Sequence, residues 1–287
     1  MSEADPPSRL GPYRAMAHRF TIELRGVPVS IGESLDYVLS TLREDSASET
    51  LLRYVLQPGE RDGRWTVHCG EDVVAEDVRL RGALADLLWH INHTAVLDAS
   101  CRRTVIHAGV VALDGAALIL PGRMESGKTT LVTGLLRRGW QYLSDEAAPL
   151  GDGGQSVRAY PKPLSIDEGS QRLFPDLDAR RGGLAGLERE QWHVPTPAIT
   201  GEPPVAEARP ALFVFPTYEP ESPTSLTEIP RSRALDLALR CTFDPCGRLT
   251  ANFRTLAAAL RGARCASLSV SDLRTALDSI EGWRTSA

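Results

Sequence analysis

The chain has 287 residues, of which 42% are hydrophobic and 24% charged, a composition typical of soluble globular proteins with about two structural units. Its net charge of −5 leaves no basic surplus for nucleic acid or an anionic membrane, and no apolar run reaches the ~18 residues of a spanning helix. The beginning of the sequence lacks the pattern of a secretory signal, and the five cysteines form no CxxC pair. These features predict a reduced, cytoplasmic chain with buried thiols rather than disulfides.

The first third of the chain predicts a flexible tail and a small unit. Residues 1–17 are rich in Pro, Ser and Asp, which favours a flexible tail. Short alternating runs at 20–24 and 65–69, with a helix near 35–42 between them, predict a small α+β unit over residues 18–82.

The remainder, residues 83–287, is predicted to form one larger domain that begins with a linking helix. Leu84, Leu87, Ile91 and Ala95 recur at spacings of three and four residues, which builds a single apolar stripe on that helix.

Two apolar runs, 105–113 and 116–120, are joined by Asp114-Gly115, the signature of a type I′ hairpin. The second strand therefore has an antiparallel partner, and we expect an α/β fold with a mixed sheet. The elements predicted after it are helix 128–138, strand 141–144, a turn at 151–154, strand 157–160, irregular structure over 168–208, strands 211–215 and 225–229, helices 231–241 and 248–262, strand 266–270 and helix 271–282.

Residues 122–129 match the phosphate-loop pattern GxxxxGK[ST] without a mismatch. Its glycines let backbone N–H groups point at phosphate oxygens, and the following helix adds the positive end of its dipole. Lys128 is expected to bridge the β- and γ-phosphates, and the Thr129 hydroxyl to bind Mg²⁺. The predicted nucleotide-binding residues are Gly122, Arg123, Met124, Glu125, Ser126, Gly127, Lys128, Thr129 and Thr130. The acidic Glu125 must point away from the phosphates.

The strand after this loop ends in two acids, Asp145 and Glu146. Carboxyl ends of strands are where open α/β sheets bind ligands, and phosphoryl transfer needs carboxylates for Mg²⁺ and for the acceptor's proton. Asp145 is therefore the predicted general base, and Asp145 and Glu146 are predicted metal ligands. An acidic surface turn is the alternative.

The chain holds only two lysines, Lys128 and Lys162, against thirty arginines. A lysine in such a chain is a candidate for a role that arginine cannot fill. Lys162, between two prolines, is either a cation near the transferred phosphoryl group or acceptor, or a surface charge. His193 is a candidate for acceptor binding or a packed histidine, and Arg181 a candidate phosphate clamp or a solvated charge.

These motifs together resemble the HPr kinase/phosphorylase superfamily, whose nucleotide core is similar to phosphoenolpyruvate carboxykinase. The resemblance covers about residues 83–282 and is closer to HPr-kinase-related proteins of peptide-modifying clusters, including lasso-peptide serine kinases. The residues that carry it are His107-Ala-Gly, Leu120-Pro-Gly, the loop 122–129, Gly139-Trp140, Leu143-Ser-Asp-Glu146, Pro161–Ile166, Phe213-Val-Phe-Pro and Tyr218.

The resemblance implies a kinase that transfers the γ-phosphoryl group of ATP, with Mg²⁺, to a hydroxyl. Lys128 and Asp145 would be catalytic, together with His107, which would contact the phosphate or the acceptor. The second acid is Glu146 where the family has Asp, and the family's phosphorolysis signature is not recognisable. HPr is therefore not the expected acceptor.

The sequence leaves three functions possible. The first is a kinase for Ser or Thr of a peptide, such as a lasso-peptide precursor; the second is a kinase for a small alcohol or amino acid. The third is a nucleotide-binding adaptor with little chemistry. A homo-oligomer is expected from the resemblance alone, and neither nucleic acid nor a membrane is an expected partner.

Overall fold

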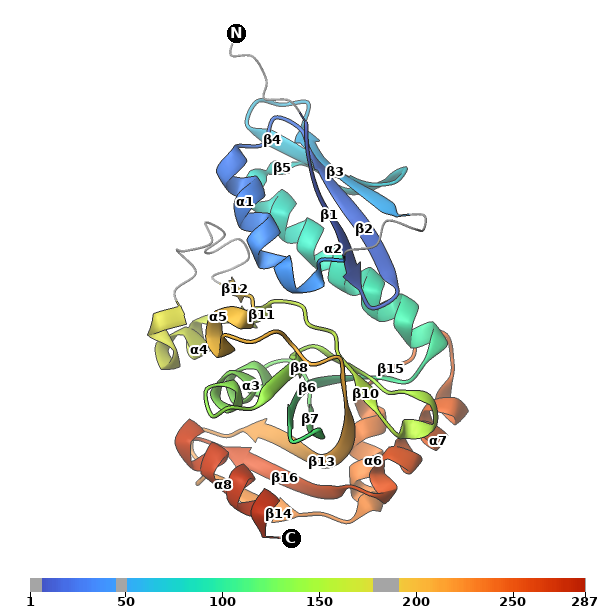
Figure 1. Cartoon of the computed structure of the whole chain (residues 1–287), viewed down its shortest axis with the longest axis vertical. Helices are drawn as coiled ribbons and strands as arrows, with labels where there is room; N and C mark the ends of the chain where they lie inside the picture. The colour runs from blue at the N-terminus through green and yellow to red at the C-terminus, as the bar shows by residue number, and fades with distance from the viewer. Residues whose placement is uncertain (1–6, 45–50, 178–190, 287) are drawn as a thin grey trace. The chain divides into compact units, whose positions relative to one another are not determined.

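The computed structural model describes residues 7–44, 51–177 and 191–286, and it divides into two compact units (Figure 1). Unit 1 takes its residues from 1–95 and 162–195, and unit 2 from 96–161 and 196–287. The boundary thus falls within the long helix α2 (Leu80–Arg102) and not before it, and a later segment groups with the N-terminal part.

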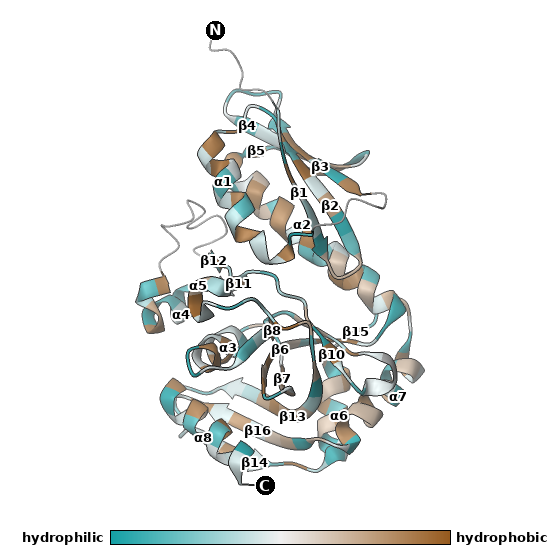
Figure 2. Ribbon diagram, viewed as in Figure 1, coloured by the Kyte–Doolittle hydropathy of each residue, from teal (hydrophilic) through white to brown (hydrophobic). Residues whose placement is uncertain are grey.

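Unit 1 is built on a five-stranded sheet in which only β2 and β3 run parallel. Apolar and polar residues alternate along its strands (Figure 2). The buried side chains of Phe20, Ile22, Tyr54 and Leu56 therefore share one face. The helices of this unit include α1 (Val29–Val38) and residues 80–95 of α2. The strands, in sheet order, are β1 (Ser8–Ala15), β2 (His18–Leu24), β3 (Leu52–Pro58), β4 (Arg64–Cys69) and β5 (Asp72–Arg79).

The predicted flexible tail is wrong for its described second half. Residues 8–15 form β1, which pairs antiparallel with β2. Tyr13 and Ala15 are fully buried, and burial of a large aromatic side chain outweighs the Pro- and Ser-rich composition around it.

The segment 162–195 contains short elements, of which α4 (Glu168–Leu173) and β12 (Trp192–Val194) fall within residues 168–208, where irregular structure was predicted. Strand β11 (Leu164–Ile166) pairs antiparallel with β12, and α4 lies between them in sequence. The carboxylate of Asp167 accepts a hydrogen bond from the Ser170 amide, which caps α4. Strands of three residues and a helix of six are too short to show a hydrophobic periodicity in the sequence.

Unit 2 contains a mixed sheet, which confirms the predicted α/β class. Its main path runs β14-β16-β13-β7-β6-β15, with β8 and β9 also on β6 and β10 on β13. Strand β13 is parallel to β7 and β16, whereas β6 is antiparallel to its neighbours. The strands are β6 (Val105–Leu113), β7 (Ala116–Pro121), β8 (Gln141–Ser144), β9 (Ala147–Pro149), β10 (Val157–Arg158), β13 (Glu207–Tyr218), β14 (Ser225–Glu228), β15 (Thr242–Phe243) and β16 (Arg264–Val270).

Helices pack on both faces of this sheet. Alternate residues of β6, among them Ile106 and Val110, join a core with α6 (Arg231–Arg240) and α7 (Leu249–Arg261). The other helices in contact with the sheet are α3 (Lys128–Leu136) and α8 (Leu273–Thr285). A Cβ atom at Gly109 would lie 2.7 Å from Val132 Cγ2, so this glycine allows α3 to pack closely on β6.

The β6–β7 hairpin is confirmed, with positive φ at both Asp114 and Gly115 as a type I′ turn requires. The prediction that all cysteines are free thiols is wrong, because Cys101 and Cys246 form a disulfide. They stand 145 residues apart, and no spacing rule reveals such a pair. Within the described residues, no helix has both the length and the apolar character needed to cross a membrane.

Candidate functional site

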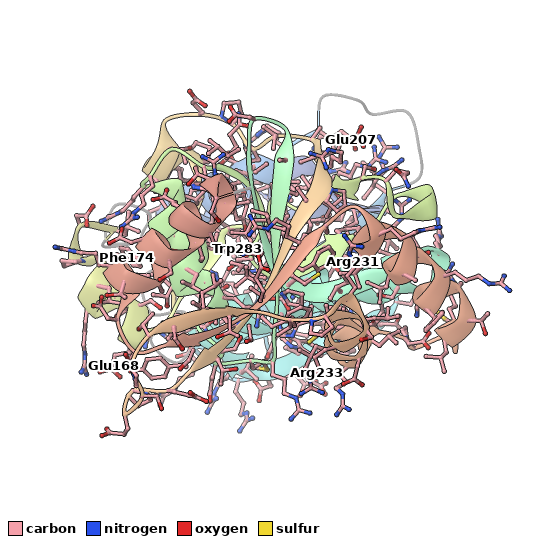
Figure 3. All side chains as sticks on the ribbon, turned by 90° about the horizontal axis from the view of Figure 1, so that it is seen from below. Glu168, Phe174, Glu207, Arg231, Arg233 and Trp283 are labelled. Carbon is pink, nitrogen blue, oxygen red and sulfur yellow. A yellow bond between two sulfur atoms is a disulfide. The ribbon has the colours of Figure 1, made fainter. Side chains whose placement is uncertain are left out.

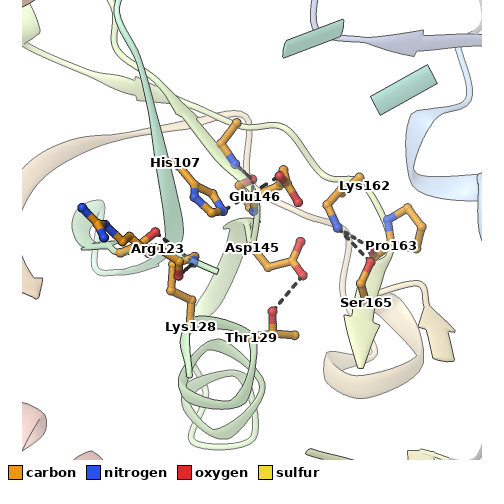
Figure 4. Close-up of polar contacts among 12 residues, drawn as sticks. His107, Arg123, Lys128, Thr129, Asp145, Glu146, Lys162, Pro163 and Ser165 are labelled. Atoms are coloured by element: carbon orange, nitrogen blue, oxygen red, sulfur yellow. Dashed lines mark hydrogen bonds and ion pairs between the residues drawn. The ribbon is translucent and has the colours of Figure 1, made fainter. Parts of the chain in front are cut away.

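The predicted phosphate loop connects β7 to α3 in unit 2 (Figure 4). Gly127 has φ of 83°, a left-handed conformation that suits glycine and turns the chain into α3. Glu125 also has positive φ, and its side chain is exposed. Met124 is 81% exposed. The loop therefore presents its acid and its apolar side chain to solvent and keeps its backbone close to the helix terminus.

Lys128 is buried at the first position of α3, and its ammonium group bends back into the loop. Its Nζ donates to the carbonyl oxygens of Gly122 at 3.0 Å and Arg123 at 2.6 Å. Burial lowers the pKa of Lys128, and the nearby carboxylates of Glu146 and Asp145 oppose this shift. A desolvated cation that donates to two carbonyl oxygens is well placed to bind an anion.

Ser126 contributes a buried polar atom that is not hydrogen-bonded. Its Oγ has no partner within the described residues, although burial of such a group costs about 1–3 kcal/mol. A Cβ at Gly122 would lie 2.4 Å from this oxygen, so the loop closes only with glycine there. This hydroxyl is an available donor, and a phosphate oxygen is an acceptor that would satisfy it.

Asp145 follows β8 next to α3, and this residue is only 4% exposed (Figure 4). One oxygen lies 3.4 Å from the Thr129 hydroxyl, and the other accepts a hydrogen bond from the Tyr142 hydroxyl at 3.0 Å. The structure thus brings together two of the predicted metal ligands, one from α3 and one from the end of β8.

The oxygen atoms of Thr129 and Asp145 suit Mg²⁺, which prefers hard oxygen ligands and is commonly held by one or two carboxylates together with substrate phosphates. In the described part of the chain, no group of three or more His, Cys, Asp or Glu side chains is arranged to hold a metal. A cation at Asp145 would therefore need oxygen atoms from a phosphate or from water.

Glu146 and His107 lie side by side on adjacent segments. The backbone amide of Ala108 donates to the Glu146 carbonyl, and the imidazole Nε2 of His107 is 4.0 Å from the Glu146 carboxylate. The His107 carbonyl accepts from the amide of Gly122, which links this strand to the start of the loop. Glu146 thus faces His107, while Asp145 faces Thr129.

The remaining predicted residues are Lys162, His193, Thr130 and Arg181. Lys162 is buried in unit 1, where its ammonium donates to the Pro163 carbonyl and the Ser165 hydroxyl, so it is not a surface charge. His193 is also buried in unit 1, opposite Ser165 in the β11–β12 pair. Thr130 lies in the first turn of α3. Arg181 lies outside the described residues.

Sequence reasoning missed Tyr142, Tyr160 and Cys241. Burial and the neighbouring Asp145 raise the pKa of Tyr142 well above its usual value, and burial with Glu146 and Asp145 does the same for Tyr160. The Cys241 carbonyl accepts from the His107 amide, and Lys128 and Arg123 partly offset the burial that raises the pKa of its thiol. Of these three residues, only Tyr142 could have been found from the sequence, because it lies on the buried strand that ends at the two acids.

No protein-family model matches the chain, and no curated protein matches it. Among solved structures, it is similar to the HPr(Ser) kinase/phosphatase from Coxiella burnetii, with 11% sequence identity. That match covers 63% of this chain and 95% of the other, and its TM-score is 0.34.

Proposed function

We propose that unit 2 is a phosphotransferase that moves the γ-phosphoryl group of ATP to an alcohol hydroxyl. The observation that carries the proposal is the juxtaposition at the start of α3. A buried lysine ammonium, a buried serine hydroxyl with no described partner and a Thr129–Asp145 oxygen pair all belong to the loop, the first turn of α3 and the strand end beside them.

The loop residues would bind the triphosphate. The Ser126 hydroxyl and the backbone amides at the N-terminus of α3 would donate to phosphate oxygens. Lys128 would exchange its two carbonyl contacts for the β- and γ-phosphates, a stronger charge-assisted interaction. Thr129 and Asp145 would hold Mg²⁺, which when bound neutralises charge on the transferring group.

Asp145 would also accept the acceptor's proton. As the alcohol oxygen attacks the γ-phosphorus, the bond from phosphorus to the β–γ bridging oxygen breaks and ADP leaves with that electron pair. The alcohol proton passes to the Asp145 carboxylate, so the charges balance. The Tyr142 hydroxyl fixes this carboxylate in place through its 3.0 Å hydrogen bond.

For the acceptor we favour Ser or Thr of a peptide, as in a lasso-peptide precursor, on the sequence resemblance. A small alcohol or amino acid is the alternative acceptor, and an adaptor that binds nucleotide without transfer is the alternative function. The three functions predict different products: a phosphorylated peptide, a phosphorylated small molecule, or no phosphorylated product. A single transfer assay therefore distinguishes them.

The test combines nucleotide calorimetry with phosphate transfer. We expect Mg-ATP to bind, and labelled ATP to give a phosphorylated Ser- or Thr-containing peptide seen by mass spectrometry. Asp145→Asn should keep nucleotide binding and lose about 10²–10⁴-fold in transfer rate, as for loss of a general base. Asp278→Asn is the matched control, because that exposed aspartate pairs with Arg138 on the surface.

Each outcome is informative. No heat with any magnesium nucleotide would overturn the proposal as a whole. Binding without transfer to any peptide or small alcohol would leave the adaptor, and full transfer by Asp145→Asn would remove Asp145 as the base.

A further inference from the structure

Residues 241–247 connect α6 to α7 in unit 2, and we call them the 241–247 segment. Figure 3 labels Arg231 and Arg233 at the start of α6, the helix that leads into this segment. Within it, β15 is a strand of only two residues, Thr242 and Phe243, which pair with the start of β6. The turn that follows, 244–247, is exposed. Because so short a strand contributes few hydrogen bonds, the segment needs other contacts to keep its position.

The disulfide supplies one of these contacts. Cys246 of the segment is bonded to Cys101 at the end of α2, and both cysteines are exposed. An exposed disulfide is accessible to a thiol in solution, whereas the free thiol of Cys265 is buried in the core. The segment is therefore anchored by a covalent bond that a reductant can reach.

The other end of the segment contacts the candidate site. The Cys241 carbonyl accepts a hydrogen bond from the His107 amide at 2.7 Å, and the centroids of the Phe243 and His107 rings are 5.7 Å apart. The His107 carbonyl in turn accepts from the amide of Gly122, the first residue of the phosphate loop, at 3.2 Å. Hydrogen bonds thus connect the segment to the loop through one residue of β6.

Electrostatic interactions indicate the same proximity. Burial raises the pKa of the Cys241 thiol, and the positive charges of Lys128 and Arg123 oppose this shift. Such an effect needs short distances, because the interaction between charges weakens as their separation grows. The segment and the phosphate loop are therefore close in space as well as connected by hydrogen bonds.

We propose that this disulfide is a redox switch on the phosphate loop, with Phe243 as a positioning residue. In the oxidised chain the 241–247 segment holds His107, and through it Gly122, in the geometry that binds the triphosphate. After reduction the segment loosens and Mg-ATP binds more weakly. The inference rests on the proposed kinase function and names the regulation of its nucleotide site.

The switch needs a dithiol as reductant, and its atoms and electrons balance. A thiolate of the dithiol attacks one cysteine sulfur, the bond between Cys101 and Cys246 breaks, and the other cysteine leaves as a thiolate. The second thiol of the reductant then closes the reductant's own disulfide and releases the first cysteine. Two electrons pass to the chain, and its two thiolates take up the two protons that the dithiol loses.

Contacts beside the disulfide confine the loosening to this segment in the folded chain. The Arg248 guanidinium donates to the Ser100 carbonyl at 3.3 Å, and the Thr104 hydroxyl donates to the Asn252 side chain at 3.0 Å. Both hydrogen bonds connect the start of α7 to the end of α2 and the residues after it, and neither needs the disulfide. Reduction therefore acts on the turn before α7 rather than on the packing of that helix.

The first test compares oxidised and reduced wild type, with dithiothreitol as the dithiol. We expect the Mg-ATP affinity, measured by calorimetry, to fall by about fivefold on reduction, as for loss of one hydrogen bond. Hydrogen exchange without nucleotide should become faster in the peptides that contain His107 and Gly122, while those of α8 stay protected. Cys246→Ser should bind like the reduced wild type and should not respond to the dithiol. Cys265→Ser is the matched control and should respond as the wild type does.

A second variant covers the case in which reduction unfolds unit 2. Phe243→Ala keeps the disulfide but removes the ring next to His107, so it should lower the Mg-ATP affinity by a similar factor. Phe243→Tyr, which keeps a ring there, should retain the wild-type affinity. Phe253→Ala, at an exposed phenylalanine of α7, is the control and should bind like the wild type.

The outcomes distinguish the switch from the proposed function. Absence of Mg-ATP binding in both redox states refutes the proposed function, whereas equal binding in both states refutes only the switch. The switch is also overturned if Phe243→Ala binds as tightly as the wild type, or if reduction leaves hydrogen exchange around His107 and Gly122 unchanged.

Discussion

The phosphate loop and the Glu23 ion pairs of unit 1 handle cations in opposite ways. The loop holds one buried lysine, contacted by carbonyl oxygens and close to carboxylates. On β2 of unit 1, Glu23 instead pairs with Arg25 at 2.6 Å and with Arg53 at 3.4 Å, and both arginines are about half exposed. An interaction with a desolvated charge is strong and local, whereas one with solvated charges is weak and sensitive to salt. We therefore expect mutations in the loop to have large effects and those at the Glu23 ion pairs small ones.

The largest effect is expected at the loop lysine. Lys128→Met should reduce Mg-ATP affinity by about 10²–10³-fold, because a charged hydrogen-bonding group to phosphate is lost from a buried site. Lys128→Arg should recover only part of this loss, since the planar guanidinium cannot replace a compact ammonium in the closed loop. Calorimetry with Mg-ATP checks both, and Arg240→Met on the surface of α6 serves as control. Equal affinity of Lys128→Met and wild type would contradict the assigned role.

The next effect concerns the stability of unit 2. Cys101→Ser, which opens the disulfide, should lower the free energy of unfolding by about 2–5 kcal/mol, the range for loss of a native disulfide. Denaturant titration of the variant against the oxidised wild type measures this loss. Cys265→Ser, at a free thiol, should keep the wild-type stability and lose it on reduction as the wild type does, whereas Cys101→Ser should not respond to reductant. An unchanged unfolding midpoint after reduction of the wild type would argue against the disulfide.

A smaller effect is expected at Tyr142. Tyr142→Phe removes one hydrogen bond to Asp145 and leaves the ring in place. A net loss of about 1 kcal/mol in transfer activity, roughly fivefold in kcat, is expected with little change in nucleotide affinity. A fall in nucleotide affinity equal to the fall in kcat would show that Tyr142 acts on the loop instead.

The smallest effect sharpens the comparison at the Glu23 ion pairs. Glu23→Gln should change stability by less than about 1 kcal/mol, because the arginines it pairs with are about half exposed and such solvated ion pairs contribute little. The hydrogen bond from Arg25 lowers the folded-state pKa of Glu23, so its contribution is fully present above the unfolded pKa of about 4.3 and disappears as the pH falls through the lower folded value. Thermal melts at neutral and acid pH measure it. A large destabilisation at neutral pH would mean that these ion pairs are structural.

Local patterns predicted much of unit 2. The hairpin at Asp114-Gly115, the strand before Asp145 and the helix after Gly127 depend on neighbouring residues, so the sequence could reveal them. The bond from Tyr142 to Asp145 was not predicted, because it depends on side-chain direction on a buried strand. Asp145 and Thr129 could be expected to meet, since both flank the end of β8 and the start of α3.

Unit 1 was less predictable because its contacts are long-range. Strand β1 is stabilised by pairing with β2 and by burial of Tyr13, and its composition alone suggests a tail. The grouping of 162–195 with the N-terminal part likewise depends on contacts between distant segments. The roles of Lys162 and His193 toward an acceptor stay predictions.

The bond between Cys101 and Cys246 closes a covalent ring that contains the loop, Asp145 and most of the sheet of unit 2. A protease cut anywhere between these two cysteines would leave both fragments joined. Such a nicked chain would migrate as one species on a gel without reductant and as two with it. Nucleotide sites of nicked and intact molecules could then be compared in a protein whose halves cannot diffuse apart.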